Sequence, residues 1–242
     1  MGETKAPAPL DDADAALLNA SPAYWAKAKR HLSRSDPTLA AIIRRHPKVA
    51  MTRRGDPFFT LARAIVGQQI SVKAAATVWG RFEVAVLAEA LATGSRSTEA
   101  ARAVAAITPA AVLAADRDAM LAAGLSRRKL EYVLDLAGHF STGKVDPLRW
   151  PDLDDEAIIE ELVEVRGIGR WTAEMFLMFN LHRPDVLPLD DIGLQKAVAL
   201  HYFSGRRVTA RTITRLARNW QPWRSVATWY LWRSLDPVPV EY

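Results

Sequence analysis

Apolar residues in this chain recur at the three- and four-residue spacing of α-helices over nearly its whole length. Two clear examples span residues 72–82 and 130–140. Alanine is abundant and alternating β-branched runs are scarce, so the local propensities favour helices over strands. The 242 residues suffice for one large domain or two small ones with a buried core. We therefore expect an all-α protein.

Periodicity and capping residues set the expected helix boundaries. The predicted helices cover 22–33, 37–45, 57–66, 71–90, 98–106, 109–115, 117–123, 126–141, 154–164, 170–181, 191–203, 209–219 and 223–234. Glycine and proline interrupt the pattern within 142–153, which is the best boundary between two helical lobes. The expected parts are a loose N-terminal tail over 1–20, one lobe made of 21–56 with 142–242, and a second lobe over 57–141.

Composition excludes several classes of function. The chain has no cysteine, which excludes disulfides, thiolate zinc sites, cysteine-ligated iron–sulfur clusters and a cysteine nucleophile. Its five histidines lack the spacing of a metal site. No signal peptide and no apolar run of membrane-spanning length is visible. We expect an intracellular protein without a membrane partner, cytoplasmic (with the nucleoid in a bacterium) or nuclear in a eukaryote, and not secreted.

The net charge of +5 is concentrated at the C-terminus. Residues 201–242 contain seven arginines and two acidic residues, which account for the whole excess, and also four of the eight tryptophans. A basic segment interleaved with aromatic residues favours a polyanionic partner. Large aromatic residues also dominate buried cores, so these side chains either fill the core or, for Tyr230 and Trp232, line a cleft.

Two glycines enclose an isoleucine in the segment Gly167-Ile168-Gly169, between two predicted helices. Glycine permits positive φ and leaves the backbone bare, so we expect both glycines to shape a tight turn around a buried Ile168. The free N–H groups of the second helix, beginning near Arg170, would then point outward at the positive end of its dipole, where a phosphate can bind. An ordinary glycine-capped connection between helices has the same pattern.

An acidic pair, Asp190-Asp191, lies directly before another predicted helix. One of the two occupies the N-cap position, and capping alone explains the pair. A fixed carboxylate at this place can also stabilise a nearby cation. Earlier in the chain, Gly67-Gln68-Gln69 breaks an apolar helix before Ser71 opens the next.

Four ordered motifs together resemble the helix-hairpin-helix DNA glycosylase superfamily, and within it the compact, monofunctional 3-methyladenine DNA glycosylases. The resemblance runs from about Pro57 to Trp232. The motifs are Gly67-Gln68-Gln69-Ile70-Ser71, Gly124-Leu125-Ser126 with Lys129, Gly167-Ile168-Gly169-Arg170-Trp171-Thr172-Ala173, and Leu187-Pro188-Leu189-Asp190-Asp191; the tail Trp220-x-Pro222-Trp223-Arg224-Ser225-x-Ala227 matches the same branch.

The resemblance implies two helical lobes flanking a cleft for DNA and the damaged base, with the helix-hairpin-helix at about 155–181. It implies that Gln69 is the wedge that fills the space of an extruded nucleotide. The other implied DNA-binding residues are Ser71, Lys129, Gly167, Gly169, Arg170 and Thr172. It further implies a monovalent cation, Na⁺ or K⁺, held by the backbone carbonyls of Val163, Val165 and Ile168. No cofactor is implied for catalysis.

The same resemblance implies that Asp191 is the catalytic carboxylate, with Asp190 as the alternative. The base pocket would contain Trp171, Met175 and Trp232, whose aromatic rings favour a cationic base. Relatives that also cleave the backbone have a lysine at the position of Trp171, so no lyase activity is expected. The implied reaction is hydrolysis of the N-glycosidic bond of 3-methyladenine or 7-methylguanine in double-stranded DNA by a monomer.

Some residues depart from the family pattern and leave other functions open. Arg166 stands where many relatives have proline, and Met175 and Ile192 stand where some have tyrosine. A less aromatic pocket alters the preference for the base. The alternatives are a glycosylase of the same fold for deaminated or etheno bases, and a non-catalytic DNA-binding protein that uses the same hairpin.

Overall fold

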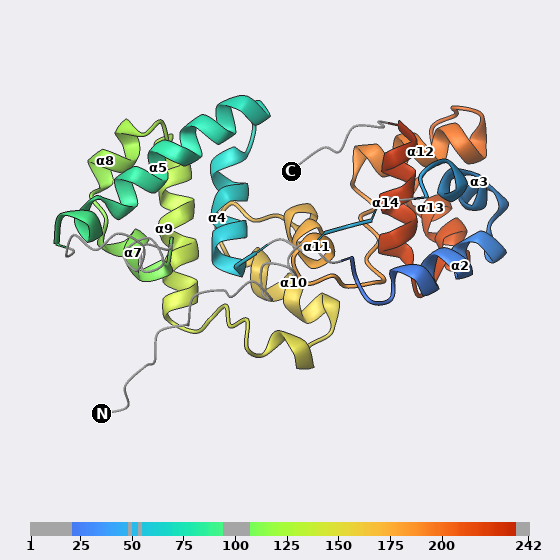
Figure 1. Ribbon diagram of the computed structural model, residues 1–242, viewed down its shortest axis with the longest axis horizontal. Coiled ribbons are helices and arrows are strands. Elements are labelled where there is room, and N and C mark those ends of the chain that lie inside the picture. The colour runs from blue at the N-terminus through green and yellow to red at the C-terminus, as the bar shows by residue number, and fades with distance from the viewer. Residues whose placement is uncertain (1–20, 48–49, 53–54, 94–106, 236–242) are drawn as a thin grey trace.

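The computed structural model describes residues 21–47, 50–52, 55–93 and 107–235 (Figure 1). Over these ranges the regular secondary structure is entirely helical, which confirms the predicted all-α class. None of the described helices is long and apolar enough to cross a membrane. The elements are α2 (Trp25–Ser35), α3 (Pro37–Arg45), α4 (Pro57–Gly67), α5 (Val72–Thr93), α7 (Pro109–Ala114), α8 (Arg117–Ala122), α9 (Arg127–Ser141), η1 (Trp150–Asp152), α10 (Asp155–Val163), α11 (Arg170–Phe179), α12 (Ile192–Phe203), α13 (Ala210–Leu216), η2 (Ala217–Trp220) and α14 (Arg224–Leu235).

Side-chain caps explain why most helices begin where the sequence predicts. The carboxylates of Asp36, Asp56 and Asp154 and the hydroxyls of Thr108 and Ser126 each accept a backbone N–H from the first turn of the helix that follows. The predicted helix over 98–106 and the predicted tail over 1–20 lie outside the described residues. The short helix η1 was not predicted; it lies inside the expected boundary segment 142–153.

Two groups of helices pack around one continuous hydrophobic core. Helices α4, α5, α7, α8 and α9 contact one another, and α2, α3, α12, α14 and η2 form the second group, with α13 against η2. Helices α10 and α11 lie between the groups, and α11 contacts α4 (Figure 1). The domain boundaries proposed from the sequence stay a prediction.

The N-terminal helices belong with the C-terminal ones because of buried aromatic and polar contacts. The Trp25 ring meets the Trp229 ring edge to face, with centroids 5.2 Å apart. Asp36, only 4% exposed, accepts hydrogen bonds from Tyr202 Oη at 2.7 Å and Trp220 Nε1 at 2.9 Å. Tyr230 is fully buried in this group, so the expectation that it lines a cleft is wrong.

Candidate active site and hairpin

The turn that contains Gly167 and Gly169 joins α10 to α11. It requires glycine at position 167 but not at position 169. Gly167 has φ +89°, and a Cβ there would overlap the ring of Tyr132 on α9. Gly169 has φ −94° and is the N-cap of α11, and a Cβ there would meet nothing within 4 Å. The expected turn around Ile168 is present, and of its two glycines only Gly167 uses the positive φ that glycine permits. Ile168 is buried between them, as predicted, at 4% exposure.

The preceding helix ends one residue before the end at 164 that the sequence predicts. Helix α10 stops at Val163, and the turn then occupies 164–169. Asp135 on α9 accepts the backbone N–H of Arg166 at 2.8 Å, and Glu131 pairs with the Arg166 guanidinium at 2.8 Å. The hairpin is thus fastened to α9, a helix that sequence reasoning had connected to the site only through Lys129.

The turn between α4 and α5 is tied to the hairpin and to α9. Gln68 Nε2 donates to the carbonyl oxygen of Gly167 at 2.8 Å, and Lys129 Nζ donates to the carbonyl oxygen of Val66 at 2.7 Å. Burial lowers the pKa of Lys129. Gln69, at the tip of the turn, is exposed and has φ +60°, a conformation that non-glycine residues seldom adopt outside functional sites. Ser71 caps α5 through Ala74 N at 3.3 Å.

Arg170, the first residue of α11, contacts two carboxylates. Its guanidinium binds Glu156 through two hydrogen bonds of 2.5 and 2.7 Å, and its Nε lies 3.2 Å from Glu174 Oε1. Arg170 lowers the pKa of Glu156, whereas burial raises the pKa of Glu174 to about 7 despite the arginine. Sequence reasoning assigned Arg170 to DNA; its guanidinium is already paired within the protein.

Asp191 is the N-cap of α12 and is only 8% exposed, whereas Asp190 is exposed. Its Oδ1 accepts the Leu194 N–H at 2.6 Å and the indole N–H of Trp232 at 2.7 Å. Its Oδ2 accepts the indole N–H of Trp171 at 3.0 Å. Two tryptophans from α11 and α14 therefore fix the carboxylate that the sequence singled out, a role for their N–H groups that the sequence did not reveal.

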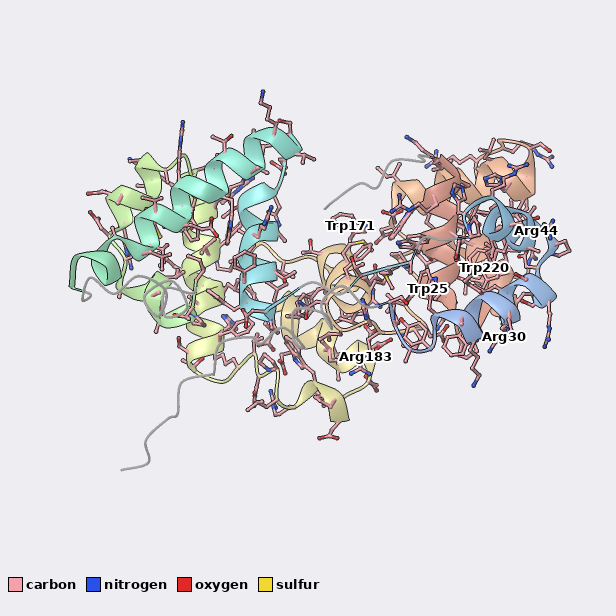
Figure 2. The ribbon with its side chains drawn as sticks, in the orientation of Figure 1. Trp25, Arg30, Arg44, Trp171, Arg183 and Trp220 are labelled. Carbon is pink, nitrogen blue, oxygen red and sulfur yellow. The ribbon has the colours of Figure 1, made fainter. Side chains whose placement is uncertain are left out.

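The faces of the two indoles differ in what they contact. Trp232 stacks on Phe179 at 6.0 Å between centroids, so one of its faces is covered. Trp171 is 38% exposed at the start of α11, near the centre of the molecule (Figure 2). Met175, one turn further along α11, is 8% exposed and belongs to the core. Thr172 is half-buried at the N-terminal turn of α11.

Gly193 is a site residue that sequence reasoning missed. A Cβ at this position would lie 2.9 Å from Trp232 Cδ1 and 3.0 Å from Asp191 Oδ1, too close for either to stay in place. Glycine is unfavourable inside a helix, so its presence in the first turn of α12 is the sequence signal that could have identified it.

The backbone around the hairpin carries oxygen donors suited to a hard monovalent cation. The carbonyl oxygen of Val165 accepts the Ile168 N–H at 3.1 Å, which leaves one of its lone pairs for a ligand. Val163 ends α10, where the last carbonyls of a helix lack intrahelical partners. Among the described residues, no group of three or more histidine or acidic side chains is placed to hold a metal ion.

A family model described as "HhH-GPD superfamily base excision DNA repair protein" matches residues 62–222. The chain is 28% identical over 213 residues to DNA-3-methyladenine glycosylase 1 of Schizosaccharomyces pombe, a match that covers 86% of each chain. It is 38% identical over 111 residues to the putative DNA-3-methyladenine glycosylase YfjP of Bacillus subtilis, which covers 46% of this chain and 39% of that protein. The solved structure of the S. pombe 3-methyladenine DNA glycosylase in complex with abasic DNA superposes with a TM-score of 0.66, at 28% identity, and covers 86% of this chain and 96% of that one.

Proposed function

This chain belongs to the HhH-GPD superfamily of base excision DNA repair proteins, and on that premise we propose that it is a monofunctional DNA glycosylase that removes alkylated purines from double-stranded DNA. The substrates are 3-methyladenine and 7-methylguanine, and the product is an abasic site. The protein acts as a monomer. The observation that carries the proposal is the Asp191 carboxylate, nearly buried at the start of α12 and held by two indole N–H groups.

Asp191 supplies the charge that the reaction requires. An N-alkylated purine is already cationic, so its glycosidic bond is weak and little acid assistance is needed for its departure. As the bond breaks, positive charge develops on the sugar, and a fixed carboxylate beside it stabilises that state. The same carboxylate orients or deprotonates the water that attacks the anomeric carbon. The balanced step consumes one water and releases the free base and an abasic deoxyribose.

The aromatic residues support the choice of a cationic base. Trp171 and Trp232 lie on either side of Asp191, and the exposed part of Trp171 provides a face for an extruded purine. Trp171 also stands where a lyase would need an amine nucleophile. Without a lysine at this position no Schiff base forms by that route, so the backbone is left intact.

The hairpin and the wedge turn support the proposal that the substrate is duplex DNA. The backbone N–H groups at Gly169, Arg170 and Thr172 begin α11, where the helix dipole favours a phosphate. Gln69 projects from the exposed turn and fills the space left by the flipped nucleotide. A Na⁺ or K⁺ ion on the carbonyls of Val163, Val165 and Ile168 would add positive charge beside that phosphate.

The deciding experiment measures excision from duplexes that each contain one defined lesion. We expect release of 3-methyladenine and 7-methylguanine, with little release of hypoxanthine, 1,N6-ethenoadenine or uracil. Asp191→Asn keeps an oxygen for Leu194 and Trp232, so it folds and binds DNA but loses nearly all activity. The control is Asp190→Asn, which changes an exposed neighbour and leaves activity within a few-fold of the wild type.

Two outcomes would replace the proposal. Preferential release of a deaminated or etheno base would make the protein a glycosylase of the same fold with another substrate class. No release of any base by a folded wild-type protein that binds DNA would make it a non-catalytic DNA-binding protein. Full activity of Asp191→Asn would remove the catalytic role from this carboxylate.

A further inference from the structure

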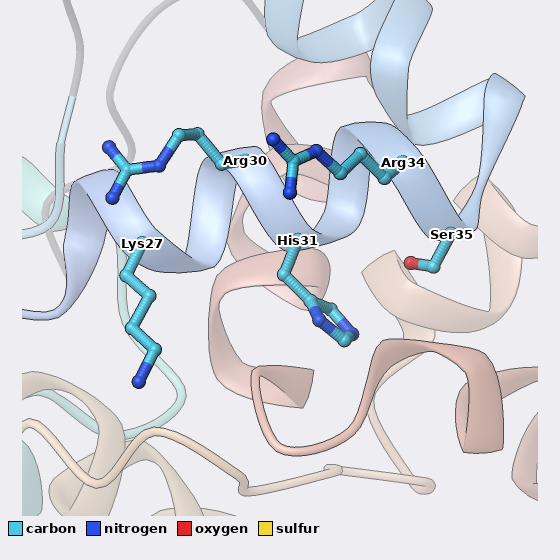
Figure 3. Close-up of a pocket in the computed structure, with 5 residues that line it drawn as sticks. All are labelled: Lys27, Arg30, His31, Arg34 and Ser35. Carbon is cyan, nitrogen blue, oxygen red and sulfur yellow. The ribbon is translucent and has the colours of Figure 1, made fainter.

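Helix α2 carries a row of basic side chains outside the site described above. Lys27, Arg30 and Arg34 are exposed and repeat at helical spacing, so they share one side of the helix. With His31 and Ser35 they line a hollow of about 360 Å³ (Figure 3). Lys27 Nζ lies 5.9 Å from the ring centroid of Trp223, the residue before α14, so this end of the row contacts an aromatic ring.

A second set of basic side chains lies on the adjoining elements α13 and η2. Arg211, Arg215 and Arg218 are exposed and line, with Thr212 and Thr214, a hollow of about 510 Å³. Helix α2 contacts η2, and α13 contacts η2, so the two sets lie on elements that pack against one another. We call the two sets together the outer basic face; it consists of Lys27, Arg30, Arg34, Arg211, Arg215 and Arg218.

The charges of the outer basic face are not neutralised by any acidic side chain that the structure describes. Over the described residues 21–47 and 201–235 the only acidic residue is Asp36, which is buried and bonded to Tyr202 and Trp220. In the described part of the chain, none of the ion pairs includes a residue of the face. Six exposed cations without carboxylate partners produce a positive field that attracts a polyanion.

The outer basic face lies apart from the residues that would hold the lesion. In Figure 1, α2 runs along the lower right of the molecule, whereas the turn between α4 and α5 is at its upper side. Figure 2 shows Trp171 near the centre and Arg30 at the lower edge of the right-hand group of helices. In this view, the row on α2 and the turn between α4 and α5 therefore lie at different edges of the molecule.

We propose that the outer basic face binds the phosphates of a second segment of duplex DNA while the first occupies the site, so that the protein passes directly between segments. This proposal rests on the proposed function only for the identity of the polyanion. Duplex DNA is favoured over an acidic protein because guanidinium groups and the hydroxyls of threonine and serine all donate hydrogen bonds to phosphate oxygens. These groups also extend along a surface, as a duplex does, rather than enclosing a single charged group.

The test follows dissociation of the full chain from a labelled, undamaged duplex as unlabelled duplex is added. Direct transfer makes the dissociation rate rise with competitor concentration, because the second segment binds before the first leaves. In Lys27→Gln/Arg30→Gln/Arg34→Gln we expect the increase of the rate with competitor to be several-fold smaller, because three of the six cations of the face are removed. The loss of three phosphate contacts also reduces a slope by about 2.7: the slope of the logarithm of the affinity for the second duplex against the logarithm of the salt concentration.

The control removes the same number of charges elsewhere. Arg81→Gln/Arg117→Gln/Lys144→Gln changes three exposed residues, on α5, on α8 and shortly after α9, and should transfer like the wild type. The outer-face variant should also keep the wild-type single-turnover excision rate on a saturating short lesion duplex. If the wild type binds DNA but excises no base, the proposed function is overturned. The transfer measurement stays valid in that case, because it uses undamaged duplex.

Three results would overturn the inference. The first is a transfer rate in the outer-face variant that still rises with competitor as in the wild type. The second is an equal loss in the control variant, which would make the effect one of net charge. The third is displacement by poly-glutamate or RNA at equal charge concentration with no effect of duplex DNA, which would assign the face to another class of partner.

Discussion

Arginines beside the hairpin and arginines on the outer basic face differ in what they contact. Those around the hairpin are paired with carboxylates: Arg149 with Glu161, Arg166 with Glu131, Arg170 with Glu156 and Arg183 with Asp155. On the outer basic face the described arginines have no carboxylate within ion-pair distance. The same residue type thus organises the protein in one region and leaves its charge available in the other.

The difference follows from where the acidic residues lie. Helix α10 and its approach are rich in them, and Asp155, Glu156 and Glu161 each bind an arginine. Under the proposed function, the hairpin is left with backbone N–H groups as its donors to phosphate. Long-range attraction to DNA then falls to the lobe that has arginines and almost no acids. A search for basic residues close to the hairpin would therefore find arginines that are paired with carboxylates rather than those of the outer basic face.

The largest expected effect tests whether the stability of the hairpin depends on the backbone conformation of Gly167. Gly167→Ala should lower the free energy of unfolding by about 2–5 kcal/mol, since the residue has a left-handed φ and its Cβ would overlap Tyr132. Gly169→Ala, at a position with open space, should cost about 1 kcal/mol or less. Denaturant unfolding measures both. Equal losses would contradict the distinction between the two glycines.

The next prediction compares one arginine from each region. Arg170→Gln leaves the buried Glu174 without its partner and should cost about 1–3 kcal/mol of stability, with no change in the salt dependence of DNA binding. Arg215→Gln should leave stability within about 0.5 kcal/mol and reduce the salt slope by about 0.9. Thermal unfolding and binding titrations over a range of salt concentrations measure the pair. The comparison would be overturned if Arg215→Gln lowered stability and Arg170→Gln reduced the salt slope.

Lys129 extends the comparison of paired and unpaired cations, because its ammonium group donates a hydrogen bond within the protein. Lys129→Met removes the donor to the carbonyl of Val66 and should cost about 1 kcal/mol, with slower excision because the wedge turn loses its anchor. Lys129→Arg should recover part of both. If Lys129→Met instead leaves stability unchanged and reduces the salt slope by about 0.9, the side chain contacts phosphate, as the sequence predicted.

The last prediction is a pH dependence of stability that comes from Glu174. Burial raises its folded-state pKa to about 7, above its ordinary value, so the folded protein binds the proton more tightly than the unfolded chain. This contribution is complete below about pH 4.5 and is lost as pH rises through about 7, with a slope of at most about 1.4 kcal/mol per pH unit. Glu174→Gln should remove that slope in unfolding measured from pH 4 to 8. An unchanged profile would assign the slope to other groups.

Local features of the site could be predicted from the sequence, and long-range partners could not. Asp191 as a cap, Ile168 as a buried residue and Ser126 as a helix start follow from patterns within a few residues. The bond from Gln68 to Gly167 spans 99 positions, and the bonds from Trp171 and Trp232 to Asp191 span 20 and 41. Such pairs depend on how whole helices pack, which no local pattern encodes.

The missed roles share one physical cause. The resemblance assigned Arg170 and Lys129 to DNA, but a nearby carboxylate or an open carbonyl gives each a partner inside the protein. Gly193 carries no charge, so its role depends entirely on how closely Trp232 approaches. Site chemistry could be inferred from residue type, whereas its supporting contacts required the fold.

The hydrogen bond from Gln68 to the carbonyl of Gly167 has a consequence for how DNA is sampled. It holds the hairpin, proposed to bind the DNA backbone, at a constant separation from Gln69, the proposed wedge. If both act as proposed, the protein spans a fixed length of strand. Gln69 would then meet the same nucleotide, counted from the bound phosphate, on each new stretch of duplex.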